Sequence, residues 1–130
     1  MSGAKPLSGR RILIVEDDRE IRQMLTIVLE AAGAETASTP NAGTALESVA
    51  TWTPDVLVVD WNLPDMSGGD LLAAMRTAGD APCSRALIVT GGLMPDEARE
   101  VGQTAGVHLL QKPFRPAALV EAISELLSVS

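Results

Sequence analysis

Aromatic residues, cysteine and histidine are all scarce in this chain of 130 residues. Tyrosine is absent, and there are two tryptophans, one phenylalanine, one cysteine and one histidine. The core must therefore be built from aliphatic side chains and methionine. A single cysteine, Cys83, cannot form an internal disulfide, which fits a reducing compartment and favours a cytoplasmic location. Because Cys83 lies in a polar loop with no histidine beside it, we do not expect it to be catalytic.

Long apolar runs and an excess of positive charge are also missing. No run approaches the roughly 20 apolar residues that a membrane-spanning helix needs, and the first eight residues lack the apolar stretch of a signal peptide. The net charge is −7, which disfavours direct binding to nucleic acid or to an anionic membrane surface. The composition thus predicts a soluble protein that binds neither nucleic acid nor a membrane directly. We also expect a monomer or weak dimer.

What the chain does contain is a regular alternation of short apolar runs and longer amphipathic segments. We expect strands at residues 11–15, 34–38, 55–59, 85–89 and 107–110. We expect helices at residues 18–32, 41–51, 67–75, 96–105 and 115–127. Continuous apolar strands between helices indicate an α/β fold, a doubly wound parallel sheet covered on both faces. The length predicts one domain, residues 10–130, after a flexible segment of residues 1–9.

Polar side chains stand where the strong strands end. Glu16 and Asp17 follow the first strand, Asp60 follows the third, Thr90 the fourth and Lys112 the fifth. In an open parallel sheet these ends meet at one crevice, where ligands bind. Three carboxylates so close together need a cation, and Mg²⁺ is the ion that prefers such oxygen ligands.

Four motifs in register resemble the receiver domain of bacterial two-component response regulators. They are residues 15–18 (VEDD), 59–68 (VDWNLPDMSG), 89–91 (VTG) and 112–114 (KPF). The resemblance covers nearly the whole chain. It implies a flavodoxin-like fold with five parallel strands in the order 2-1-3-4-5 and five helices. It also implies a phosphoacceptor that switches partner binding.

The resemblance assigns a role to each residue of the crevice. Asp60 matches the aspartate that takes a phosphoryl group from a kinase phosphohistidine. Asp17 matches the direct Mg²⁺ ligand and Glu16 the acid that acts mainly through water. The main-chain carbonyl of Asn62 matches a further ligand. Asp60 itself completes the metal site.

Thr90 and Lys112 match the residues that sense the phosphoryl group, through a hydroxyl and a charged amine respectively. In this family the bond from Lys112 to Pro113 is cis. The implied donor is a sensor histidine kinase or a histidine phosphotransfer protein, and the implied receiver of the signal is an unknown downstream protein. Such a domain catalyses its own phosphorylation and dephosphorylation, and it is no enzyme on external substrates unless it belongs to a hybrid histidine kinase.

Several residues have simpler interpretations. Asp18 is the kind of residue that a helix start attracts, and His108, in a predicted strand, is expected to be structural. We expect Trp61 to be half-exposed and to pack over its loop. Leu109 stands where many receivers carry an aromatic switch residue, and Gly92 stands where the rate of hydrolysis is tuned.

Two other functions stay open at this point. The first is a binding module of the same fold that no longer needs phosphate, for which Leu109 is the reason. The second is a metal-dependent phosphatase, which the absence of a second aspartate two residues after Asp60 argues against. The chain is either a stand-alone receiver or the receiver part of a longer protein such as a hybrid kinase.

Overall fold

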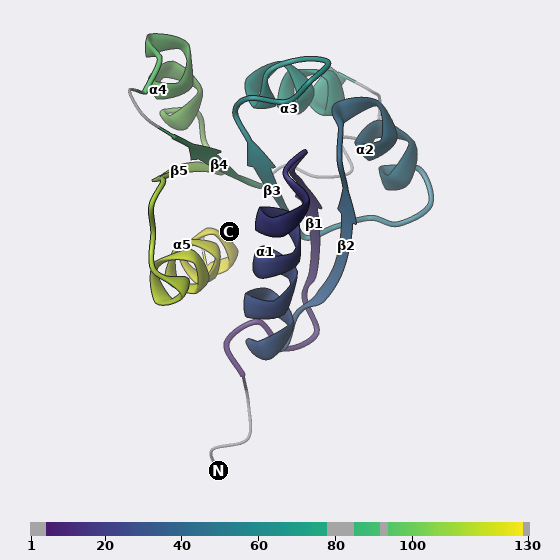
Figure 1. Cartoon of the computed structure of the whole chain (residues 1–130), viewed down its shortest axis with the longest axis vertical. Coiled ribbons are helices and arrows are strands. Elements are labelled where there is room, and N and C mark those ends of the chain that lie inside the picture. The colour runs from purple at the N-terminus through teal and green to yellow at the C-terminus, as the bar shows by residue number, and fades with distance from the viewer. Residues whose placement is uncertain (1–4, 78–84, 92–93, 129–130) are drawn as a thin grey trace.

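The fold is a five-stranded parallel sheet with helices on both faces (Figure 1). The computed structural model describes residues 5–77, 85–91 and 94–128. The strands run in the order β2-β1-β3-β4-β5, which confirms the predicted topology. They are β1 (Arg11–Val15), β2 (Glu35–Thr39), β3 (Val56–Asp60), β4 (Ala86–Thr90) and β5 (Val107–Gln111).

Two groups of helices cover the sheet. The helices are α1 (Arg19–Ala31), α2 (Ala42–Val49), α3 (Gly68–Thr77), α4 (Asp96–Gly102) and α5 (Pro116–Ser128). In Figure 1, α1 and α5 lie together on one side of the sheet, and α2 and α3 lie on the other. Within the described residues, none of the helices combines the length and the apolar character that crossing a bilayer requires.

The central strands are buried on both faces because alternate side chains enter different cores. Ile12 and Ile14 of β1 pack with α1 and α5. Leu13 and Val15 of the same strand pack with α2 and α3 on the opposite face. Such two-sided burial explains why these strands read in the sequence as unbroken apolar runs.

The helix ends follow the predicted capping chemistry. The Asp18 side chain accepts the backbone N–H groups of Glu20 and Ile21, which accounts for its place at the start of α1. Asn41 caps α2, and its side chain accepts the backbone N–H of Thr44. Gly33 follows α1 with φ = 103°, a left-handed conformation that favours glycine.

Flexibility is expected over residues 1–9, but the described part of this segment, residues 5–9, packs against the domain at Leu7. Leu7 is fully buried in the core that α1 and α5 share, and its backbone N–H donates to the carbonyl oxygen of Ala32 at 2.9 Å. The packed domain therefore begins before residue 10, at least at Leu7. The physical reason is that one leucine closes the end of the core beside α1.

We predict that Leu7→Ala lowers the free energy of unfolding by about 2–5 kcal/mol, the usual cost of emptying a buried leucine site. Urea unfolding followed by circular dichroism measures the change. Ser8→Ala, at an exposed neighbour, is the matched control and should leave the unfolding midpoint unchanged. Equal midpoints for both variants would show that the segment contributes nothing to the core.

Candidate functional site

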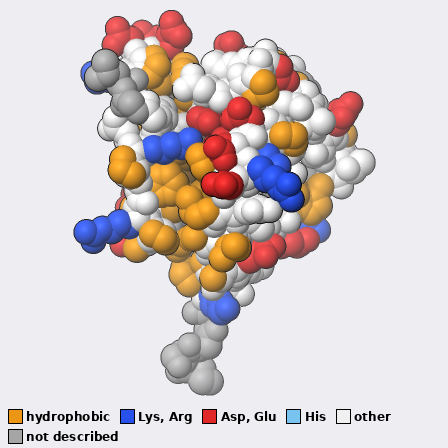
Figure 2. All heavy atoms as spheres, in the orientation of Figure 1, with side chains coloured by type: hydrophobic (Ala, Val, Ile, Leu, Met, Phe, Trp, Pro, Cys, Tyr) orange, Lys and Arg blue, Asp and Glu red, His pale blue; other side chains and the backbone are white. Residues whose placement is uncertain are grey.

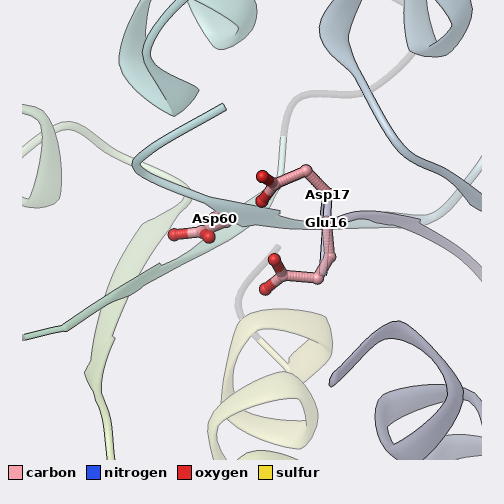
Figure 3. A group of neighbouring side chains, drawn as sticks. All are labelled: Glu16, Asp17 and Asp60. Atoms are coloured by element: carbon pink, nitrogen blue, oxygen red, sulfur yellow. The ribbon is translucent and has the colours of Figure 1, made fainter. Parts of the chain in front are cut away.

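Three carboxylates converge at the carboxyl edge of the sheet, as the sequence predicts. Glu16 and Asp17 directly follow β1, and Asp60 is the last residue of the neighbouring strand β3. Figure 3 shows their side chains turned toward one another. Each offers a carboxylate oxygen, and these oxygens all lie within 4.8 Å of one another. Glu16 and Asp60 are buried, whereas Asp17 is exposed.

Lys112 supplies positive charge to this cluster. Its Nζ lies 3.4 Å from Glu16 Oε1 and 3.6 Å from Asp60 Oδ2. The backbone N–H of Lys112 donates to the carbonyl oxygen of Thr90 at 2.7 Å. The peptide bond to Pro113 is cis, as expected for the family that the motifs resemble. The lysine thus bridges the two acids that are buried most deeply.

Backbone N–H groups orient the same two carboxylates. The N–H of Asp18 donates to Glu16 Oε2 at 3.1 Å, and the N–H of Asn62 donates to Asp60 Oδ1 at 3.2 Å. Each acid therefore has one oxygen held by the backbone and the other facing Lys112. The backbone and Lys112 together thus fix the direction of both carboxylates.

The environment raises the pKa of Glu16 from 4.5 to about 7. Burial, which removes water from the carboxylate, is the largest cause, and the neighbouring negative charge of Asp60 acts in the same direction. The hydrogen bond from the Asp18 backbone and the positive charge of Lys112 act against the rise. One lysine thus leaves the negative charge of this cluster incompletely balanced.

The donor set fits a hard divalent cation. The three carboxylates supply only oxygen ligands, which Mg²⁺ prefers, and two of them face the single ammonium group of Lys112. Asn62 lies two residues after Asp60, and its backbone N–H bonds to the Asp60 carboxylate, so the residue adjoins the cluster.

Thr90 brings a hydroxyl group to the neighbouring strand end. Its side chain is buried, and its Oγ1 has no hydrogen-bond partner among the residues that the structure describes. A buried hydroxyl without a partner is costly, so this oxygen is ready to bond to an incoming acceptor. The structure thus brings Glu16, Asp17, Asp60, Thr90 and Lys112 together.

Trp61 is buried, so the expectation of a half-exposed ring is wrong. Its relative exposure is 6%, and it belongs to the core on the side of α2 and α3. A side chain added at Gly69 would stand 2.7 Å from the indole Cζ3 atom, so the glycine makes room for the ring at the start of α3. The same added side chain at Gly69 would stand 3.2 Å from Cγ2 of Val101 in α4.

Leu109 also packs against α4. A side chain at Gly102 would stand 2.6 Å from Leu109 Cδ1, so the leucine lies directly on the last residue of α4. Gly92 and Cys83, which the sequence singled out, lie outside the described residues. His108 is half-buried in β5, next to Leu109, and its structural role stays a prediction.

Two contacts of the site loops were not expected from the sequence. The carboxylate of Asp65, in the loop after β3, accepts the N–H groups of Ala42 and Gly43 at 3.0 and 2.9 Å, which lowers its pKa. Arg22 donates to the main-chain oxygens of Glu16 and Asp17. The sequence contained one indication of the Asp65 contact. The first turn of α2 carries no acid of its own, and a helix start favours a nearby negative charge.

The raised pKa of Glu16 predicts a pH-dependent stability of the metal-free protein. The folded state keeps this proton up to about pH 7, whereas the unfolded chain releases it near 4.5. The folded state therefore binds more protons in this window, and the free energy of unfolding should fall as pH rises from 4.5 to 7. The expected loss is at most roughly 3 kcal/mol.

Urea unfolding in EDTA across this window measures the effect, with Glu16→Gln as the control. The variant has no proton to lose at this position, so the difference between the two proteins isolates Glu16 from every other titrating group. Parallel pH profiles for the two proteins would contradict the prediction.

Comparisons with known proteins agree with this geometry. The model of the family described as the response regulator receiver domain matches residues 12–124. Chemotaxis protein CheY of Pseudomonas aeruginosa is 33% identical over 117 residues, which cover 89% of this chain and 94% of that protein. A CheY-like receiver domain protein of Methanospirillum hungatei has a solved structure with a TM-score of 0.81 and 31% identity, covering 92% of this chain and 94% of that one.

A longer relative matches over only part of its length. The DNA-binding response regulator MtrA of Mycobacterium leprae is 34% identical over 116 residues, which cover 88% of this chain and 49% of that protein. This chain thus spans about half the length of the MtrA relatives. The family model, the identity to CheY and the shared fold lead to one conclusion: the chain belongs to the response regulator receiver domain family of two-component signalling systems.

Proposed function

We propose that this domain accepts a phosphoryl group on Asp60 and thereby changes its affinity for a downstream protein. The observation that carries the proposal is the position of the Asp60 carboxylate. It is nearly buried at the end of β3, has Lys112 Nζ 3.6 Å away, and shares a cluster with Glu16 and Asp17. A carboxylate held in this way has a defined direction of attack and a cation beside it.

The transfer we propose is a direct displacement at phosphorus. An oxygen of Asp60 forms a bond to phosphorus while the bond from phosphorus to the imidazole nitrogen of a phosphohistidine breaks. The electron pair of that bond stays on the nitrogen, which takes up a proton. The N–H of Asn62 fixes Asp60 Oδ1, and Lys112 offsets negative charge on the transferred oxygens. The protein thus contributes positioning and charge neutralisation.

We assign the metal site to the carboxylates of Glu16, Asp17 and Asp60 and to the main-chain carbonyl of Asn62. When bound there, Mg²⁺ supplies positive charge that stabilises the phosphoryl oxygens during transfer. The acids keep the cation beside the nucleophile. Three carboxylates with one lysine beside them favour the binding of a cation.

Thr90 and Lys112 are the residues that we assign to sensing the phosphoryl group. The unpartnered Thr90 hydroxyl would gain a hydrogen bond to a phosphoryl oxygen, and Lys112 would gain an ion pair. The two are coupled, because the N–H of Lys112 donates to the carbonyl of Thr90. A movement of either residue therefore reaches β4 and β5 together.

We propose a sensor histidine kinase or a histidine phosphotransfer protein as the donor and a protein as the target. The lone cysteine suits a reducing compartment, which supports a cytoplasmic location. The acidic charge argues against direct contact of this domain with nucleic acid or a membrane, and we expect a monomer or weak dimer. The domain acts either by itself or as the receiver part of a hybrid kinase.

A second candidate is an interaction module whose partner binding does not depend on phosphate. Leu109 favours it, because this aliphatic side chain lies against Gly102 of α4 where many receivers carry a ring that changes position. The intact cluster of Glu16, Asp60 and Lys112 favours the phosphoacceptor. Partner binding by Asp60→Asn decides between the two, since the module requires it to be unchanged.

We predict that acetyl phosphate with Mg²⁺ adds one phosphoryl group, about 80 Da, to the intact mass of the protein. Beryllofluoride with Mg²⁺ should change the fluorescence of Trp61, because its ring lies in the core directly after Asp60. Trp52→Phe removes the other tryptophan, which lies over Arg11 at the opposite end of β1.

Asp60→Asn is the control for both measurements and should give no adduct. Asp65→Asn replaces a carboxylate of the neighbouring loop with a carboxamide, and this variant should still be phosphorylated. If the wild-type protein gains neither mass nor a fluorescence response over a range of Mg²⁺ concentrations, the proposed function is wrong.

A further inference from the structure

Arg22 lies in α1 and reaches back to the loop that carries the acid pair. Its Nη1 donates to the main-chain oxygen of Glu16 at 2.8 Å and, less closely, to that of Asp17 at 3.4 Å. The side chain is half-buried. An arginine that bonds to two successive carbonyls fixes both peptide planes, because its guanidinium is rigid and planar.

Those two peptide planes determine where the acids stand. The carbonyl of Glu16 belongs to the peptide that sets the position of the Asp17 backbone, and the carbonyl of Asp17 does the same for Asp18. Asp17 is exposed, and no hydrogen bond to its carboxylate is found among the described residues. The side chain of Arg22 therefore restrains the two peptide groups on either side of Asp17.

The other contacts of this loop fix different atoms. The N–H of Glu16 donates to Thr39 in β2 at 3.1 Å, and the N–H of Asp18 donates to the Glu16 carboxylate. Neither bond involves the carbonyl oxygens that accept from Arg22. Removal of Arg22 would leave these oxygens to water and free the peptide planes to rotate.

The positive charge of Arg22 allows two possible roles to be distinguished by the direction of their effect on Mg²⁺ affinity. A positive charge near a cation site repels the cation, so a purely electrostatic role would weaken Mg²⁺ binding. Among the described residues, Arg22 forms no ion pair with an acid side chain, and its donors go to carbonyls instead. Positioning and repulsion therefore predict opposite effects of removing the side chain.

We propose that Arg22 is a positioning residue for the metal site, which holds Glu16 and Asp17 in place through their main-chain oxygens. This inference rests on the proposed function, because it assumes that the acids bind Mg²⁺. Groups that orient metal ligands in this way typically contribute 10- to 100-fold to metal affinity. Arg22 thus offsets its own repulsion of the cation by orienting the ligands.

The test is a Mg²⁺ titration of the full chain, followed by Trp61 fluorescence in the Trp52→Phe background and by calorimetry. Arg22→Ala should raise the Mg²⁺ dissociation constant about ten-fold. Arg22→Lys keeps one charged donor and should restore most of the affinity. In phosphorylation by acetyl phosphate, Arg22→Ala should need more Mg²⁺ for half-maximal rate, with a plateau rate close to that of wild type.

Arg19→Ala is the matched control. Arg19 is exposed at the start of the same helix and lines the same surface hollow as Arg22. No hydrogen bond from Arg19 to the loop is found among the described residues. Its removal takes away one positive charge without loosening the carbonyls, so Mg²⁺ affinity should stay the same or rise.

An unchanged or tighter dissociation constant for Arg22→Ala would overturn the inference. Circular dichroism in EDTA identifies loss of the fold; if Arg22→Ala does not fold, the comparison passes to Arg22→Lys and Arg22→Gln. A loss of affinity in the glutamine variant that exceeds the loss in the lysine variant supports the inference, and equal affinities overturn it. A wild-type protein that does not bind Mg²⁺ would instead contradict the proposed function itself.

Discussion

Two buried carboxylates, Glu16 and Asp60, share one lysine at the end of an apolar sheet. The rest of the site depends on this arrangement of two acids around one base. Lys112 approaches both within 4 Å. Its charge does not cancel the effects of burial and repulsion, since the pKa of Glu16 stays raised. In the proposed function, a cation bound to the three carboxylates offsets their negative charge and then favours an incoming phosphoryl group. The fold tolerates this local cost because the burial of apolar side chains from the same strands stabilises it.

The sheet provides the rigid frame for this site. Parallel strands place residues 16, 60 and 90 at one edge, although they are far apart in the chain. The loops that follow the strands are tied down by bonds to other elements. Asp65 joins the loop after β3 to the start of α2, and Arg22 joins the loop after β1 to α1. Binding groups on exposed loops thus gain the precision of the strands below them.

Two residues near the site pack beside α4. Trp61, directly after Asp60, lies against Gly69 and close to Val101 of α4. Leu109 of β5 lies on Gly102, the last residue of α4. Both contacts are van der Waals packing in a close-packed interior, where small displacements are transmitted because there is little free volume. An aliphatic residue at position 109 therefore leaves α4 in direct contact with the strand that precedes Lys112.

The sequence by itself determined the alternation of strands and helices, the parallel sheet and the identity of the clustered residues. It could do so because apolar periodicity encodes the elements, and because parallel strand ends must meet at one edge. The helix cap Asp18 could also be predicted from the sequence, because a cap bonds to backbone groups only two or three residues away. Only the tertiary structure decided the burial of Trp61 and Leu7, the bond from Asp65 to α2 and the contact of Arg22 with its loop. The burial of a side chain depends on the space beside a distant segment, as Gly69 provides space for the indole ring. The contacts of a long side chain such as Arg22 depend on which of several rotamers it takes. The periodicity of the sequence carries no information on burial by distant segments or on rotamers, so these contacts are fixed only when the chain packs.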